Sequence, residues 1–149
     1  GGSALGGDID LNGHNIIFKK TSTTAHSHNG DIIKIGTGTT VQGEIVYLTS
    51  SGTWASADAD DVAKSGNVLL AISLGTNPSS DGMLIRGMYT LQYGAGTIGN
   101  PLYVSTSAGE TTSTAPTGSG DVVRVIGYCL DSTNGQIYFN PSNDWIELS

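Results

Sequence analysis

The sequence is poor in cysteine and in basic residues, and each shortage excludes a class of protein. Its 149 residues include a single cysteine, Cys129, so no disulfide can form within one chain. Lys and Arg number 6 against 13 Asp and Glu, which gives a formal net charge of −7 at pH 7. Because binding to a phosphate backbone needs a basic face, we expect no nucleic-acid partner. The same acidity disfavours an anionic membrane surface and favours solubility.

Long apolar stretches are also missing. No run approaches the roughly 20 residues that a membrane helix needs, so we expect no membrane insertion. The chain does not open with the basic-then-apolar pattern of a secretory signal. Residues 55–65 alone have some helical tendency, and they predict a loop or one short turn that includes Val62 and Ala63, capped by Ser56 or Asp58.

The sequence is rich in glycine, with 22 residues placed between short apolar segments. Residues 122–130 and 136–139 predict an antiparallel pair across an Asx-Gly turn, with a short last strand at 145–148. Further strands are predicted at 32–35, 44–49, 68–74, 83–92 and 102–105, with a loop at 76–82. Gly87 predicts a bulge or a close backbone approach. Short strands between glycine turns predict an all-β sandwich or small barrel of antiparallel strands.

Two parts of the chain repeat the same order of features. Tyr47 and Tyr103 each stand four residues after a glycine, and an apolar residue and a hydroxyl residue follow each tyrosine. A turn, an apolar strand, an Asx-Gly loop and another strand come next in both. This order is typical of a duplicated β unit, here residues 38–92 and 96–148. Chance similarity among glycine-rich hairpins would give the same pattern, so both explanations stay open.

Residues 1–35 predict an extended N-terminal arm ahead of a β domain at residues 36–149. The arm carries Ile9, Leu11 and the apolar run 16–18 among glycines and polar residues. A short segment of this kind cannot bury its apolar side chains alone. We expect it to pack on the main domain or on another copy of the chain, as an oligomerisation segment.

No catalytic residues emerge from the sequence. Serine is abundant, but no nucleophile elbow precedes a helix, and Cys129 lies in an apolar strand, which is typical of an inert buried thiol. Asp58, Asp60 and Asp61 cluster, but without the glycine turn and distal glutamate of a calcium loop. We therefore predict that the chain is not an enzyme; cleavage of a glycan by paired carboxylates is the alternative.

Four residues are candidates for ligand contacts. Trp54 follows a turn and Tyr93 stands beside Gly94-Ala95-Gly96, so both are predicted to be exposed and to stack on a sugar ring or anchor a protein contact. His26 and His28 are two residues apart, a spacing that places both imidazoles on one face of a strand. Alternatively, they are solvated loop residues.

The segment Gly6–Ile16, GGDIDLNGHNI, resembles a stretch common in bacteriophage tail-fibre and related virion proteins. The pattern of strands and turns over residues 36–148 is similar to β modules of phage head-decoration and tail-associated proteins. The resemblance implies a homotrimer located in the virion. It also implies that His26 and His28 of three copies form a His-x-His ring for a metal ion, the one cofactor we expect.

These features predict a viral structural protein. The first hypothesis is the distal domain of a tail fibre that attaches to a host surface through the loops at 76–82, 93–100 and 108–120. Its partners would be its own copies, other virion proteins and a host surface glycan or protein. The second is a capsid decoration or head-fibre protein bound to the virion shell, and the third is a glycan-degrading tail-spike domain.

Overall fold

A computed structural model describes residues 11–17, 19 and 22–149. The other residues of the predicted arm, including Ile9 and residues 6–10 of the phage-like segment, lie outside the described residues. The strands are β1 (His28–Ile33), β2 (Ile45–Leu48), β3 (Trp54–Ser56), β4 (Leu70–Ser73), β5 (Met83–Thr90), β6 (Pro101–Val104), β7 (Thr111–Thr112), β8 (Val122–Val123), β9 (Val125–Asp131), β10 (Gln136–Phe139) and β11 (Ile146–Glu147).

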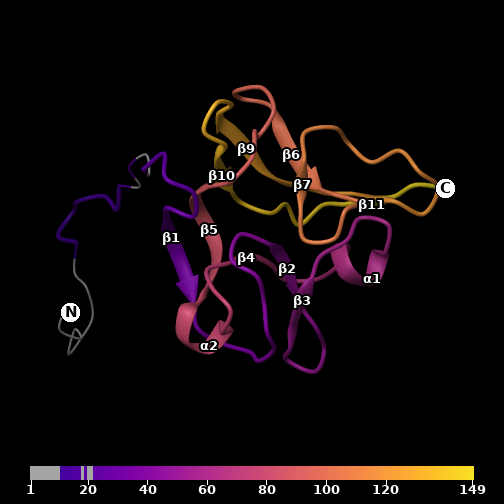
Figure 1. Ribbon diagram of the computed structural model, residues 1–149, viewed down its shortest axis with the longest axis horizontal. Helices are drawn as coiled ribbons and strands as arrows, with labels where there is room; N and C mark the ends of the chain where they lie inside the picture. Colours follow the sequence, from indigo (N-terminus) through magenta and orange to yellow (C-terminus); the bar gives the residue numbers. More distant parts are fainter. Residues whose placement is uncertain (1–10, 18, 20–21) are drawn as a thin grey trace.

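The main sheet is antiparallel and curls into a half-barrel (Figure 1). Its strand order is β3-β2-β4-β5-β10-β9-β6-β7, with β1 paired to β5, while β8 and β11 form a separate pair. The predicted all-β fold of short antiparallel strands is therefore confirmed. In the described part of the chain, no helix is long and apolar enough to cross a membrane.

Strand β5 joins the two halves of the sheet. Its first residues pair with β4, its last residues pair with β10, and β1 runs along its length. Gly30 and Gly87 face each other in the β1–β5 pair, with φ of +140° and +147°. A Cβ at Gly87 would lie 2.1 Å from the Asn29 carbonyl oxygen. The close backbone approach predicted at Gly87 is therefore confirmed.

The two halves of the sheet share one connectivity. On one side of the β5–β10 contact the order is β4, β2, β3, and on the other it is β9, β6, β7. Tyr47 and Tyr103 occupy the third position of β2 and β6, and both are half-buried. This is the arrangement that a duplicated β unit would give, although duplication itself stays a hypothesis.

The larger apolar cluster takes buried residues from both halves of the sheet, among them Ile45, Ile72, Tyr89, Ile126 and Phe139. A second cluster covers the opposite face of β2 and β4, where Val46 and Ala71 are buried with Trp54 and Met83. All four residues of β4 are buried, so this strand packs against apolar side chains on both of its faces. Burial on both faces removes more apolar surface from water than burial on one face would.

The described part of the chain has two helices, each a single turn of four residues. The turn expected within residues 55–65 is α1 (Val62–Ser65), but its N-cap is Asp61, whose carboxylate accepts from Ala63 N at 2.9 Å. The predicted caps Ser56 and Asp58 are therefore wrong, because both precede the turn by too many residues. The second turn, α2 (Pro78–Asp81), lies within the predicted loop 76–82 and is capped by Asn77.

The described residues of the N-terminal segment divide into two parts. Strand β1 belongs to the main sheet, so residues 28–33 are part of the β domain, although the predicted boundary placed them in the arm. Ile16 and Ile17, in contrast, are 70% and 72% exposed. Their side chains thus stay accessible to another surface.

Candidate functional site

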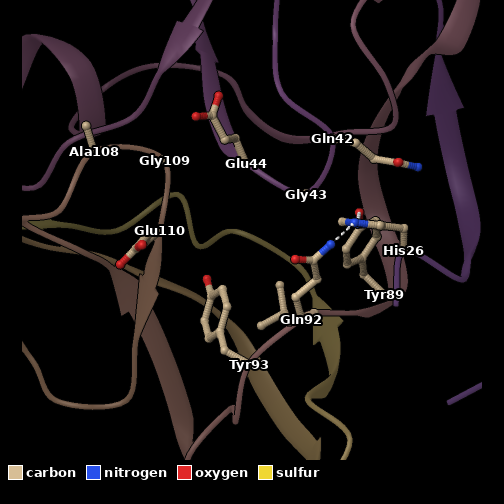
Figure 2. Close-up of a pocket in the computed structure, with 11 residues that line it drawn as sticks. His26, Gln42, Gly43, Glu44, Tyr89, Gln92, Tyr93, Ala108, Gly109 and Glu110 are labelled. Carbon is tan, nitrogen blue, oxygen red and sulfur yellow. Dashed lines mark hydrogen bonds between the residues drawn. The ribbon is translucent and has the colours of Figure 1, made fainter. Parts of the chain in front are cut away.

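A pocket of about 280 Å³ opens where four separate segments meet (Figure 2). The segments are the chain just before β1, the residues just before β2, the end of β5 with the residues that follow it, and the turn before β7. Their side chains and backbone line the pocket together: His26, Gln42, Gly43, Glu44, Tyr89, Leu91, Gln92, Tyr93, Ala108, Gly109 and Glu110.

Backbone hydrogen bonds bring the two glutamates into this pocket. Ile45 N donates to the Gly109 carbonyl at 2.8 Å, which joins the start of β2 to the turn that carries Glu110. Glu44 immediately precedes Ile45, so both glutamates come to line the same pocket (Figure 2). The sequence contains the dipeptide Gly-Glu at both places, 43–44 and 109–110, and this repetition is the one sequence signal that could have identified the pair.

Gly43 keeps the inner wall of the pocket open. Its φ is +91°, in the region that favours glycine, and a Cβ there would lie 3.1 Å from the His26 ring and 3.3 Å from the Tyr89 hydroxyl. Any larger residue would therefore press on both rings as well as strain the backbone.

A hydrogen-bonded row of side chains forms one side of the pocket. Gln92 Nε2 donates to His26 Nε2 at 2.5 Å, which leaves the proton of a neutral imidazole on Nδ1. That Nδ1 lies 2.7 Å from the Tyr89 hydroxyl. Burial raises the pKa of Tyr89, and the nearby Tyr93 adds to the effect. Tyr89 therefore remains a neutral phenol that orients His26.

Tyr93 provides an exposed aromatic ring at the pocket. The residue is 41% exposed, and its hydroxyl accepts a hydrogen bond from Thr111 N at 3.1 Å. This contact fixes the ring while leaving part of its surface open to solvent. The predicted exposure of Tyr93 is confirmed; its role in ligand binding stays a prediction.

Trp54 lies elsewhere and is not exposed. It is 2% exposed, and its indole Nε1 donates to the Ile35 carbonyl at 2.8 Å. The backbone around Gly36 packs directly on the indole ring. The prediction that Trp54 is accessible for ligand contact is therefore wrong, because the chain that follows β1 covers it.

The two histidines of the predicted metal ring do not share one strand face. His26 has a φ of +67° and lies ahead of β1, so the alternation of side chains between the two faces of a strand does not apply to it. His28 Nδ1 donates to the His26 carbonyl at 2.8 Å, and its ring stacks on Tyr89 with centroids 6.1 Å apart. Within the described residues of one chain, no group of three or more His, Cys, Asp or Glu is placed to hold a metal ion. A ring made by three copies stays a prediction, and His28 would offer it Nε2.

The aspartate cluster has a structural role around α1. Lys64 lies 3.2 Å from an Asp61 carboxylate oxygen and 4.0 Å from one of Asp58. A hydrogen bond from Lys64 lowers the pKa of Asp61, whereas burial raises the pKa of Asp58. Asp61 caps the helical turn, both carboxylates lie beside Lys64, and neither lines the pocket beside Tyr93.

No protein-family model, no curated protein and no solved structure matches this chain.

Proposed function

We propose that this chain is the distal domain of a tail fibre or a similar virion fibre, and that it attaches to a host surface by binding a glycan in the pocket beside Tyr93. The resemblance of residues 6–16 to phage fibre segments supports the proposal that the chain belongs to a virion fibre. The observation that carries the binding role is the pocket itself, where an exposed aromatic ring stands among polar side chains held on a rigid sheet.

The lining chemistry suits a neutral sugar or an amino sugar. Glu44 and Glu110 accept hydrogen bonds from hydroxyl or ammonium groups, and the amides of Gln42 and Gln92 both donate and accept. The ring of Tyr93 offers an apolar face to the C–H side of a pyranose. Two carboxylates without a lining Lys or Arg disfavour an anionic ligand at this place.

Binding to a glycan array tests the proposal. Tyr93→Ala removes the ring from the pocket and should weaken the retained glycan by at least about tenfold. Tyr128→Ala is the matched control, because Tyr128 on β9 is 45% exposed and does not line the pocket. Equal binding by both variants, or no retained glycan for the unchanged protein, would contradict the proposal.

Glycan cleavage is a second candidate, since two glutamates, Glu44 and Glu110, line one pocket. A retaining or inverting hydrolase needs such a pair on either side of the scissile bond. Release of reducing sugar by the unchanged protein, lost in Glu44→Gln and Glu110→Gln while the glycan stays bound, would favour cleavage over adhesion. Binding without release would favour the adhesion module.

Attachment to a capsid is a third candidate, favoured by the exposed Ile16 and Ile17. These side chains could pack on a neighbouring copy in a fibre or on the virion shell. Deleting residues 1–20 should abolish capsid binding if the chain is a decoration protein. The deletion should leave glycan binding intact if the pocket beside Tyr93 is the functional site.

A further inference from the structure

Arg124 is a buried cation whose hydrogen bonds within the described chain all go to backbone oxygens. It lies between β8 and β9 and is 6% exposed. Its Nε donates to the Ser142 carbonyl at 2.9 Å, and its Nη1 donates to the carbonyls of Ser65 at 3.1 Å, Val68 at 2.9 Å and Gly66. Among the described residues no carboxylate forms an ion pair with it.

A buried guanidinium without a paired carboxylate can still bind an anion. Carbonyl dipoles satisfy part of its hydrogen-bonding potential, but a buried charge is best stabilised by an opposite charge. Burial lowers the pKa of Arg124, the direction that desolvation without a neighbouring anion produces. Nη2 donates to no atom of the described chain, so the N–H groups of this one nitrogen are available for an anion.

Arg124 forms part of the wall of a second cavity, with a volume of about 470 Å³. Three exposed asparagines, Asn67, Asn140 and Asn143, line the same cavity. Each amide both donates and accepts hydrogen bonds, so three amides can bind neighbouring hydroxyl groups of a ligand whatever direction each hydroxyl points. Leu69, which is exposed, and the ring of Pro141 add apolar surface for C–H groups.

We propose that this cavity binds an acidic sugar, with the carboxylate on the guanidinium of Arg124 and the ring hydroxyls on the asparagine amides. The combination of one buried cation, several amides and a small apolar surface matches a pyranose that carries a carboxylate. This site shares no lining residue with the pocket beside Tyr93, so it stands or fails independently of the proposed function.

Titration of ¹⁵N-labelled protein with sodium glucuronate, N-acetylneuraminate, glucose and acetate tests the site. At least one acidic sugar should shift the Arg124 Nε–H signal and the side-chain amide signals of Asn67 and Asn143. Glucose, which lacks the carboxylate, should bind at least about tenfold more weakly. Acetate binding as tightly as the acidic sugars would reduce the site to a plain anion site and overturn the proposal, as would silence of the Arg124 signal with both acidic sugars.

Variants separate binding from folding. Arg124→Gln should abolish the shifts, but it also removes bonds that hold the end of α1 to residues 140–143 and can unfold the protein. Asn143→Asp keeps those bonds and places a repelling carboxylate in the cavity, so it should weaken the acidic sugar by at least about tenfold. Asn100→Asp makes the same charge change at an exposed turn outside the cavity and should bind normally. Equal binding by Asn143→Asp and Asn100→Asp would contradict the proposal.

Discussion

At the scale of single residues, burial and backbone contacts could be predicted where the residues next to a position in the sequence determine its surroundings. Cys129 is buried as its apolar strand predicts, and Gly87 lies in a close backbone contact. Trp54 was mispredicted because the segment that covers it, around Ile35 and Gly36, folds back from a distant part of the chain. Local sequence contains no signal for such long-range cover.

Replacing Gly87 with Ala should destabilise the protein strongly. The new Cβ would collide with the Asn29 carbonyl, and the φ of +147° is one that L residues rarely adopt. Backbone strain alone should lower the free energy of unfolding by about 1–3 kcal/mol. Gly99→Ala is the control, since Gly99 has a φ of +85° with open space around its Cβ position. Urea unfolding should give a larger loss for Gly87→Ala; equal losses would refute the close contact.

The Cys129 thiol should be unreactive in the native protein. The residue is fully buried, and burial raises the pKa of its thiol, so the thiolate that attacks alkylating reagents is scarce. Iodoacetamide at pH 8 should label the native protein far more slowly than the urea-unfolded chain, as mass spectrometry would measure. Rapid labelling of the native state would contradict the burial of Cys129.

At the scale of elements, strands were easier to predict than the site they build. The strand signals at 44–49, 68–74, 83–92, 102–105 and 136–139 all correspond to strands of the main sheet, because branched and aromatic residues between glycines specify them locally. The predicted strand 122–130 is divided into β8, which pairs with β11, and β9, which belongs to the main sheet. The pocket beside Tyr93 was only partly predictable. Glu44 and Glu110 meet through the pairing of Ile45 with Gly109, a contact between remote turns.

Helix α2 was missed because its four residues read as a polar loop, yet its caps are specific. Asn77 Oδ1 accepts from Ser79 N at 3.2 Å, and Asp81 Oδ2 accepts from Asn77 N at 2.8 Å. Asn77→Ala should lower the free energy of unfolding by about 1 kcal/mol, the usual value of an N-cap. Asn77→Asp keeps an accepting oxygen and should retain most of that stability in thermal unfolding. Equal stability of Asn77→Ala and the unchanged protein would mean that the cap contributes nothing.

At the scale of the whole molecule, the N-terminal segment ahead of the half-barrel exposes apolar side chains. Ile16 and Ile17 stand out on the N-terminal segment. If the chain is a fibre domain, light scattering should give the mass of three chains, and Ile16→Ser with Ile17→Ser should shift the mass towards one chain. A single-chain mass for the unchanged protein would contradict the trimer.

The most direct test of the central claim is to locate the binding site of a glycan that the array retains. The saccharide should be titrated into ¹⁵N-labelled protein, and the backbone amide shifts should be mapped onto the sheet. Adhesion through the pocket beside Tyr93 predicts that the largest shifts gather at residues 42–44, 89–93 and 108–111. Shifts confined to other residues, with those three segments unchanged, would contradict the claim.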